Sequence, residues 1–598
     1  MNNEKNLAQM WKNRVARFGD RPCMRFKKDG QWVTFTYRDV DRRVTDLAHG
    51  LTALGFNRGD RLALLSENRP YWAIADLAVQ CLGGIDATIY ATNTPAQCAY
   101  IIKDSESQFV AVSNNNQLNK VLDKKNDLPL LEKIIIFDPI IGITDRDPRV
   151  KSIEEVMELG REYAHPEKIT AAIEKTTLDD VATLIYTSGT TGDPKGVMLT
   201  HGNFYSNVEA ATSVMPIGPD ESFLSFLPLS HSLERTGGYY VAIYIGAVIN
   251  YAESVDALRQ NLVEVKPTAM ISVPRIYEKF HAAILDKVSK GPKAKQVLFN
   301  WALKVGKEAL RYKLSKKALP LALQVQYNLA DKLVYHNIKQ ALGGKLNFAI
   351  SGGAPLAPEL FEFFFALGIP IYEGYGLTET TPVITIATPD HLKMGTVGRA
   401  APGITVKIAD DGEILCQGPN VMKGYWKKPE DTKEALANGW FHTGDIGVLD
   451  EEGFLKITDR KKDLIITAGG KNVAPQNIEN LLKMDRLIEQ VNVIGDRRKF
   501  LTAIIVPAFK DLEAWAREKG LKFENRAELV KLPEVVQLLQ DAVDRANKEL
   551  AKYESIKKFI ISDIEFTQDN DMLTPTLKVK RKIVNKFFAK QIEHMYEE

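Results

Sequence analysis

The chain has 598 residues, of which 45% are hydrophobic and 26% are charged, and its formal net charge is +2. This is the composition of an ordinary folded protein, so it excludes long disordered stretches. The length corresponds to about four domains by a simple length prior and provides enough chain to bury several cores.

Neither the N-terminus nor the most apolar segment of the chain indicates a targeting or membrane segment. Residues 1–15 are polar and of mixed charge, without the apolar core of a signal peptide. The most apolar segment, 237–250, is shorter than the roughly 20 residues of a spanning helix, which favours a buried strand or helix. The four cysteines have no metal-ligand spacing and predict neither a zinc site nor a disulfide framework. We therefore expect a cytoplasmic, reducing location.

The first predicted elements are a helix and a strand. Apolar residues recur at helical spacing at Val40, Val44, Leu47, Leu51 and Leu54. Gly55 stands where a helix C-cap belongs. The apolar run 61–65 then predicts a strand, and helix-then-strand units of this kind recur along the chain.

A second strand, predicted over 181–185, leads into a loop of unusual composition. The loop, Tyr186-Thr-Ser-Gly-Thr-Thr-Gly-Asp-Pro-Lys-Gly196, contains four aliphatic hydroxyls, three glycines and one lysine. Backbone N–H groups and hydroxyls in such a turn converge on an anion. It is not a Walker loop, because Lys195 is followed by Gly196 rather than by the Ser or Thr that ligates Mg²⁺. A flexible surface turn is the alternative, but the incoming strand and the rigid Pro194-Lys195 end favour a phosphate-binding loop.

The segment 281–345 is strongly basic, with 13 Lys and Arg against 3 Asp and Glu. Within it, the apolar residues Leu298, Trp301, Ala302 and Val305 recur at helical spacing. The basic residues Lys304, Lys307, Arg311 and Lys313 are interleaved with them or follow them. The pattern predicts an amphipathic helix. Such a helix either lies on an anionic lipid surface or packs on its own domain and leaves a basic face in water.

A βαβ unit is predicted next, with its strand, helix and strand at residues 347–350, 356–367 and 369–372. Ligands in such sheets bind beyond the carboxyl ends of the strands. The segments 186–196, 351–355 and 375–380 each follow a predicted strand, so we expect them to line a binding site.

A domain boundary is predicted near Asp459. The charged stretch Asp459-Arg-Lys-Lys-Asp463 precedes a new series of elements: a strand at 464–467, a Gly-rich turn at 468–472 and a helix opened by Pro475.

The loop at 186–196 resembles the phosphate loop of the adenylate-forming superfamily, which contains acyl-CoA synthetases, adenylation domains of peptide synthetases and beetle luciferases. Four further segments match the superfamily's motifs in their order: Ser351-Gly-Gly-Ala-Pro355, Tyr375-Gly-Leu-Thr-Glu-Thr380, Trp440-Phe-His-Thr-Gly-Asp445 and Asp459-Arg-Lys-Lys-Asp463. Three others are similar to those of long-chain fatty acyl-CoA synthetases: Pro228-Leu-Ser-His-Ser-Leu-Glu-Arg235, Val273-Pro-Arg-Ile-Tyr-Glu-Lys279 and Leu573-Thr-Pro-Thr-Leu-Lys578.

The resemblance implies an α/β fold with two domains. A large N-terminal domain, residues 1–459, would be built of βαβ sheets and bind ATP and the fatty acid. A small, mobile α+β domain, residues 460–598, would follow it. The implied reaction joins a long-chain fatty acid to CoA through an acyl-adenylate and releases AMP and pyrophosphate, with ATP, Mg²⁺ and CoA as cofactors or co-substrates. No nucleic-acid partner is expected.

The resemblance also assigns roles around the phosphates of ATP. The residues that would bind the β- and γ-phosphates are Thr187, Ser188, Gly189, Thr190, Thr191, Gly192 and Lys195. Thr378 would contact the α-phosphate, and Glu379 would be the metal ligand for Mg²⁺.

The nucleoside and the acyl chain have their own implied residues. Asp445 would accept hydrogen bonds from the ribose, with Arg460 beside it. The adenine slot would be lined by Tyr375, Gly353 and Ala354. His231 would lie at the acyl-binding wall near the reacting carboxylate, although a hydrogen-bonded core histidine is the alternative. Some relatives place a bulky aromatic gate a few residues further on, where this chain has Glu234 and Arg235, so the gate is not carried over.

In the small domain, the resemblance makes Lys578 the lysine that bridges carboxylate and phosphate during adenylation. Nearby basic residues leave the register open, and a solvated basic face is the alternative. Gly469 and Gly470 would permit close backbone approach along the pantetheine arm of CoA. One site cannot hold both Lys578 and this turn against the same phosphate, so the small domain would rotate about a hinge at Lys462.

Two alternatives keep the first half-reaction but use acyl carrier protein, or no acceptor, in the second. A third is a catalytically silent fatty-acid-binding or uptake protein. Acyl chain length cannot be inferred from the motifs. Homodimerisation and peripheral contact with an anionic membrane are further expectations that the sequence leaves open.

Overall fold

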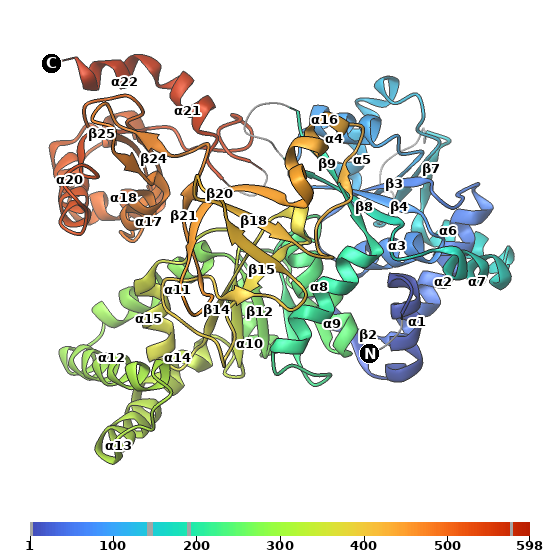
Figure 1. The fold of residues 1–598 in the computed structure, drawn as a ribbon, viewed down its shortest axis with the longest axis horizontal. Helices are drawn as coiled ribbons and strands as arrows, with labels where there is room; N and C mark the ends of the chain where they lie inside the picture. Colours follow the sequence, from blue (N-terminus) through green and yellow to red (C-terminus); the bar gives the residue numbers. More distant parts are fainter. Residues whose placement is uncertain (1–3, 140–146, 188–192, 575–577, 598) are drawn as a thin grey trace. The chain divides into compact units, whose positions relative to one another are not determined.

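The computed structural model describes residues 4–139, 147–187, 193–574 and 578–597. The chain divides into two compact units (Figure 1). The large unit comprises Met1–Lys407, Leu415–Thr443 and Leu449–Lys456, and the small unit comprises Ile408–Ile414, Gly444–Val448 and Ile457–Glu598. The functional boundary expected at residue 459 stays a prediction.

An eight-stranded sheet forms one layer of the large unit. Its strands, in spatial order, are β19 (Gly424–Tyr425), β9 (Lys195–Thr200), β8 (Val181–Thr187), β4 (Ile85–Ile89), β3 (Arg61–Leu65), β5 (Phe109–Val112), β6 (Lys133–Ile136) and β7 (Val150–Ser152). The six strands from β8 to β7 are parallel, whereas β9 and β19 are antiparallel to their neighbours. The strands predicted at 61–65 and 181–185 are confirmed as β3 and β8.

A nine-stranded sheet forms a second layer. Its strands, in spatial order, are β16 (Arg399–Ala400), β15 (Val383–Ile386), β14 (Ile371–Gly376), β13 (Phe348–Ser351), β12 (Ala269–Ser272), β10 (Ser222–Ser225), β11 (Val248–Tyr251), β1 (Pro22–Lys28) and β2 (Gln31–Thr36). The predicted βαβ unit is confirmed as β13, α15 (Pro358–Ala366) and β14, with its two strands parallel. β14 begins two residues later than predicted, at Ile371, directly after Pro370, which has no N–H to donate.

Helices cover and separate these sheets. The predicted first helix is α2 (Tyr37–Ala53), which Thr36 and Asp39 open with a capping box. It ends just before Gly55, whose φ of +99° suits glycine. α3 (Pro70–Cys81) is buried along nearly its whole length, because it packs against β3 and β4 of one sheet and β1 of the other.

The large unit has further α-helices. They are α1 (Leu7–Phe18), α4 (Pro95–Asp104), α5 (Asn115–Leu122), α6 (Ile153–Glu162), α7 (Pro166–Lys175), α8 (His201–Val214), α9 (Val241–Ile245), α10 (Leu258–Val265), α11 (Pro274–Ser289), α12 (Lys293–Leu314), α13 (Leu321–Ala330), α14 (His336–Ala341) and α16 (Pro429–Ala435).

Two segments that the sequence left open are now defined. The apolar segment 237–250 contains both alternatives, since the π-helix Glu234–Tyr240 and α9 precede β11. The basic amphipathic helix is α12, whose residues Ala302 and Val305 are buried. α12 packs on α15 of its own unit, where Lys307 forms an ion pair with Glu362 at 2.5 Å.

The small unit is an α+β body with its own apolar core. It contains a three-stranded sheet of β24 (Ile488–Ile494), β25 (Leu501–Pro507) and β26 (Ile556–Ile561), and a hairpin of β22 (Ile465–Ile466) and β23 (Asn472–Val473). Its helices are α17 (Pro475–Leu482), α18 (Phe509–Glu518), α19 (Arg526–Leu529), α20 (Pro533–Asn547), α21 (Arg581–Phe587) and α22 (Ala589–Tyr596). The predicted series of short strand, turn and helix after residue 463 is confirmed as β22, its turn and α17.

A further sheet has four strands. Its order is β17 (Thr405–Ile408), β18 (Glu413–Gln417), β20 (Phe441–Leu449) and β21 (Leu455–Arg460). None of the helices in the described part of the chain has both the length and the apolar character needed to cross a membrane.

Candidate functional site

The two ends of the predicted phosphate loop are held close together. Thr187, the last residue of β8, is paired with Lys195, the first residue of β9. The hydroxyl of Tyr100 donates a hydrogen bond to the carbonyl of Pro194 at 3.0 Å, and that of Tyr186 donates to Asp104 at 2.7 Å. The remaining loop residues named above, Ser188, Gly189, Thr190, Thr191 and Gly192, lie outside the described residues. The anchored ends fix the span that this loop must bridge.

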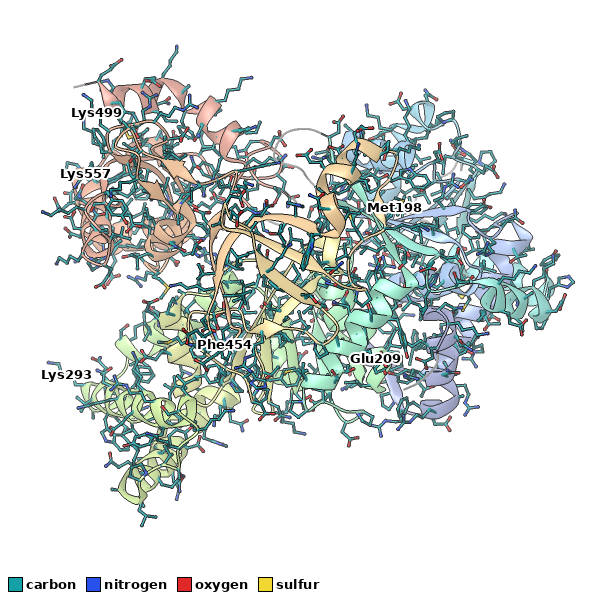
Figure 2. All side chains as sticks on the ribbon, viewed as in Figure 1. Met198, Glu209, Lys293, Phe454, Lys499 and Lys557 are labelled. Atoms are coloured by element: carbon teal, nitrogen blue, oxygen red, sulfur yellow. The ribbon has the colours of Figure 1, made fainter. Side chains whose placement is uncertain are left out.

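Lys195 and Glu379 meet at a tyrosine that the sequence analysis did not single out. The Lys195 ammonium lies 5.1 Å from the centre of the Tyr425 ring, and the Tyr425 hydroxyl donates to Glu379 Oε1 at 2.9 Å. Burial and the Glu379 charge raise the pKa of Tyr425, so it stays a neutral donor. Tyr425 is placed by β19, in which Gly424 pairs with Met198 of β9, a residue labelled in Figure 2. A short Gly-Tyr-Trp run in the sequence was the only available signal.

The Lys195 ammonium is also paired with Asp431 on α16, at 2.6 Å. Each of these side chains is about one-third exposed. An ion pair so open to water stabilises a protein by only about 0–1 kcal/mol. An anionic phosphate can therefore take the place of Asp431 at little energetic cost.

Thr378 and Glu379 lie in the 3-10 turn Thr378–Thr380, which Leu377 separates from the end of β14. Thr378 is buried, and its Oγ1 lies 3.4 Å from Oγ of Ser232. The neighbouring His231 accepts a hydrogen bond at Nδ1 from the Leu233 N–H, at 3.1 Å. Since Nδ1 is an acceptor, we assign the ring proton to Nε2. The structure thus brings the expected acyl-wall histidine and the expected α-phosphate threonine to the two sides of Ser232.

The three residues expected to line an adenine slot lie on or just after two neighbouring strands, β13 and β14. Gly353 and Ala354 are exposed and follow β13, and Tyr375 is a buried residue of β14 rather than a loop residue as predicted. The φ of Gly353 is +79°, a backbone conformation that favours glycine. This turn allows the chain to leave the sheet edge immediately after β13.

In the small unit, the expected ribose ligand is already paired. Asp445 is buried, and one of its carboxylate oxygens accepts a hydrogen bond from Arg460 Nε at 3.1 Å. Lys462 is an exposed residue of the turn after β21. Gly469 and Gly470 are exposed in the turn between β22 and β23, where the Gly470 N–H donates to the Thr467 carbonyl. Asp445 and Arg460 therefore form a preassembled polar pair.

The Lys578 N–H donates to Thr574 Oγ1 at 3.0 Å, and the Thr574 N–H donates to the Lys578 carbonyl at 2.8 Å. Desolvation lowers the pKa of the Lys578 ammonium, Arg460 lowers it further, and Asp445 and Asp463 oppose both effects. The residue keeps exposed surface, and water there reduces the cost of holding the charge. Arg460 and Asp445 are thus among the charges that act on Lys578.

Arg235, at the position where some relatives have an aromatic gate, belongs to a buried ion cluster. Its guanidinium donates to Asp76 and, at 2.7 Å, to both oxygens of Asp86. The hydroxyls of Tyr239 and Tyr240 donate to Asp76 as well, at 2.8 and 2.9 Å. All of these side chains are fully buried. Arg235 therefore joins α3, β4 and the π-helix and is not free to swing as a gate.

Glu234, the other residue at that position, is buried without a hydrogen-bond partner among the described residues. It fits because Gly238 has no side chain: a Cβ there would lie 2.4 Å from Glu234 Oε1. Burial raises the pKa of Glu234 to about 8, and the nearby Ser225 opposes this effect without reaching hydrogen-bond geometry. Glu234 is thus held as a neutral acid at neutral pH.

Glu234→Gln should stabilise the protein increasingly as the pH rises. In the wild type, the unfolded chain releases the proton near pH 4.5 and the folded protein near pH 8, so stability falls across this window. The variant has no such proton. We expect its melting temperature to exceed that of the wild type by at least about 2 °C at pH 8 and by much less at pH 5. Parallel pH profiles of the two melting temperatures, measured by scanning calorimetry, would contradict the burial argument.

The paired ends of the Gly- and hydroxyl-rich segment, with Lys195 and Glu379 beside Tyr425 in a unit of parallel sheets, are typical of an α/β enzyme that acts on a nucleotide. The comparisons specify the family. The model of the AMP-binding enzyme family matches residues 11–426, and that of the AMP-binding enzyme C-terminal domain matches residues 462–598. The chain belongs to the AMP-binding enzyme family.

Curated relatives match over nearly the whole chain. The long-chain-fatty-acid–CoA ligase FadD15 of Mycobacterium bovis is 36% identical over 95% of this chain and 93% of its own length. The long-chain-fatty-acid–CoA ligase ACSBG2 of Xenopus laevis is 32% identical, over 99% and 84%. Among solved structures, the adenylation domain of a Mycobacterium chelonae carboxylate reductase has a TM-score of 0.77 at 22% identity, over 99% and 91%. The predicted superfamily and fold class are confirmed.

Proposed function

We propose that this protein is an ATP-dependent long-chain fatty acid CoA ligase. It converts a fatty acid, ATP and CoA into acyl-CoA, AMP and pyrophosphate through an acyl-adenylate. The observation that carries the proposal is the meeting of Lys195 and Glu379 at Tyr425, beside the anchored ends of the phosphate loop. Its support from sequence is the near full-length match to long-chain-fatty-acid–CoA ligases.

The first half-reaction has an electrostatic problem that these residues address. A carboxylate oxygen attacks the α-phosphorus, and the bond between that phosphorus and the bridging oxygen of pyrophosphate breaks. Both reactants are anions, so cations and oriented dipoles must offset their repulsion. We assign this role to Lys195 and the loop for the departing pyrophosphate, and to Thr378 for the α-phosphate. His231 would bound the acyl carboxylate.

The residues present suit one magnesium ion held mainly by its substrate. No group of three or more His, Cys, Asp or Glu side chains suited to a metal occurs in the described ranges. Mg²⁺ commonly takes one or two carboxylates and completes its shell with phosphate oxygens and water. Glu379, oriented by Tyr425, is our proposed protein ligand. The ion would supply charge neutralisation to the triphosphate.

The second half-reaction needs a different set of residues. The CoA thiol loses its proton, its sulfur bonds to the acyl carbon, and the bond from that carbon to the AMP oxygen breaks. We assign Lys578 to adenylation and the Gly469-Gly470 turn to the pantetheine arm, with Lys462 as the hinge between the two arrangements. Asp445 and Arg460 would hold the ribose, and Gly353, Ala354 and Tyr375 the adenine, throughout.

Two other functions remain as alternatives. An enzyme that uses acyl carrier protein would share the entire first half-reaction. A silent fatty-acid-binding protein would not need Lys195, Glu379, Asp445 or Lys578, and all four are present. The intact set therefore favours catalysis over binding alone.

Thioester formation with CoA and with acyl carrier protein separates these possibilities. With palmitate, ATP and Mg²⁺, we expect AMP release and acyl-CoA, and at least about tenfold less acyl-carrier protein at equal acceptor concentration. This ratio corresponds to about 1.4 kcal/mol of transition-state preference. Adenylation without transfer to CoA would reject the CoA ligase, and the absence of AMP release would reject catalysis altogether.

We also propose a cytoplasmic location, peripheral contact with anionic membrane, and a homodimer. Cys23, Cys81, Cys98 and Cys416 are free and buried, which suits a reducing compartment. Sedimentation velocity of the purified protein tests the dimer.

A further inference from the structure

One face of α13 exposes an apolar stripe. Leu321, Val325 and Leu329 are 87%, 67% and 48% exposed. Their spacing of four residues places them on one side of the helix. Leu323 and Ala330, on the opposite side, are buried. We call the three exposed residues the α13 stripe.

The buried side of α13 is the one that attaches the helix to the large unit. Tyr327 packs against Tyr335, with ring centres 5.5 Å apart, and its hydroxyl accepts a hydrogen bond from Lys313 of α12 at 3.2 Å. α12 and α13 lie side by side in Figure 1. These contacts use the buried side of α13, so they leave the α13 stripe exposed in the described part of the chain.

The segment that leads into α13 carries positive charge only, and Asp331, which directly follows α13, is paired with Lys339 at 2.8 Å. Residues 309–330 include Arg311, Lys313, Lys316 and Lys317 and no Asp or Glu. Lys316 and Lys317 are exposed in the connection that leads from α12 into α13. At the other end of α12, the side chain of Lys293, labelled in Figure 2, is exposed as well. An exposed apolar stripe beside such a basic connection is complementary to a surface that is anionic outside and apolar within.

We propose that the α13 stripe docks on an anionic phospholipid bilayer, with the lysines of the α12–α13 connection on the headgroups. α13 has ten residues and is about 15 Å long, so it lies in the interface and does not cross the membrane. The apolar residues of α12 do not make this contact, because Ala302 and Val305 are buried in the large unit. The benefit of docking rests on the proposed function. A long-chain fatty acid partitions into bilayers, so a docked enzyme would meet its substrate there at a high local concentration.

Sedimentation with vesicles tests the contact without any use of catalysis. At low salt, we expect wild-type protein to sediment with vesicles of phosphatidylcholine that contain roughly 30–40% phosphatidylglycerol, because this anionic lipid gives the vesicles a strong negative surface potential. We expect little sedimentation with pure phosphatidylcholine. The variant L321N/V325N/L329N should lose at least about tenfold in vesicle affinity, because it removes the apolar side chains that docking would bury in the bilayer. K316Q/K317Q should weaken binding and reduce its dependence on salt.

A matched control removes exposed apolar side chains elsewhere in the protein. Leu130, Val255 and Val536 are 50%, 50% and 40% exposed and lie outside α12 and α13. The variant L130N/V255N/V536N should therefore bind vesicles like the wild type. Equal loss of binding in both triple variants would overturn the assignment to α13.

A label at the stripe gives a second readout in a folded, otherwise native protein. The four native cysteines are buried, so V325C can be labelled selectively with an environment-sensitive maleimide. Its emission should shift to the blue on anionic vesicles, whereas a label at V255C should not shift. No shift at residue 325, or a wild type that ignores anionic vesicles at low salt, would overturn the proposal.

The same variants distinguish a second copy of this chain as the occupant. If the stripe is a dimer interface, L321N/V325N/L329N will lower the sedimentation coefficient of vesicle-free protein, and this outcome also overturns the proposal. Ligase activity on detergent-dispersed acid should be unchanged in the triple variant. If the wild type has no ligase activity but still binds anionic vesicles, the proposed function is contradicted and the docking proposal is not.

Discussion

Lys578→Ala will nearly abolish acyl-adenylate formation and leave the transfer of supplied acyl-adenylate to CoA largely intact. The ammonium is proposed to act on charge that develops only in the adenylation transition state. Its loss should cost on the order of 3 kcal/mol, or roughly a hundredfold in rate. Pyrophosphate release measures the first half-reaction, and thioester formation from synthetic acyl-adenylate measures the second.

A neighbouring lysine supplies the control for this experiment. Lys580 lies in the same basic segment, but its ammonium is paired with Asp571. Lys580→Ala should therefore affect neither half-reaction by more than a few-fold. Equal losses in both half-reactions of Lys578→Ala, or a larger loss in Lys580→Ala, would show that the adenylation lysine is misassigned.

Arg235→Met will destabilise the large unit strongly. The substitution leaves the carboxylates of Asp76 and Asp86 buried and facing each other without their cation. Breaking a buried pair by removing one partner costs about 3–5 kcal/mol. Burial already raises the pKa of Asp76, with Arg235 opposing that effect. We therefore expect Asp76 to take up a proton in the variant.

Urea unfolding followed by near-ultraviolet circular dichroism measures this loss in the large unit. The control is Arg38→Ala, which removes an exposed ion pair with Asp20 and should change stability by about 0–1 kcal/mol. The additional change D76N in Arg235→Met should recover part of the stability, because it removes one uncompensated charge. A variant as stable as Arg38→Ala would contradict a structural role for the cluster.

The sequence by itself determined the elements whose signals are local. The apolar run 61–65 became β3 without any change of bounds, and the strand before the phosphate loop was placed correctly. The hydrophobic period and the residues that end an element act over a few positions, so both can be read from one chain. The family could be read as well, because its motifs are short, ordered and continuous in sequence.

Only the tertiary structure decided which distant residues act together. Lys195 and Asp431 are 236 positions apart, and Tyr425 has no motif that ties it to Glu379. The same holds for Arg235, whose neighbours in sequence gave no indication of the carboxylates on α3 and β4. Amphipathic spacing also cannot say what covers an apolar face, and the structure buries that of α12 while exposing the stripe of α13. The physical reason is that pairing and burial depend on chain packing, which brings together segments whose local patterns carry no record of each other.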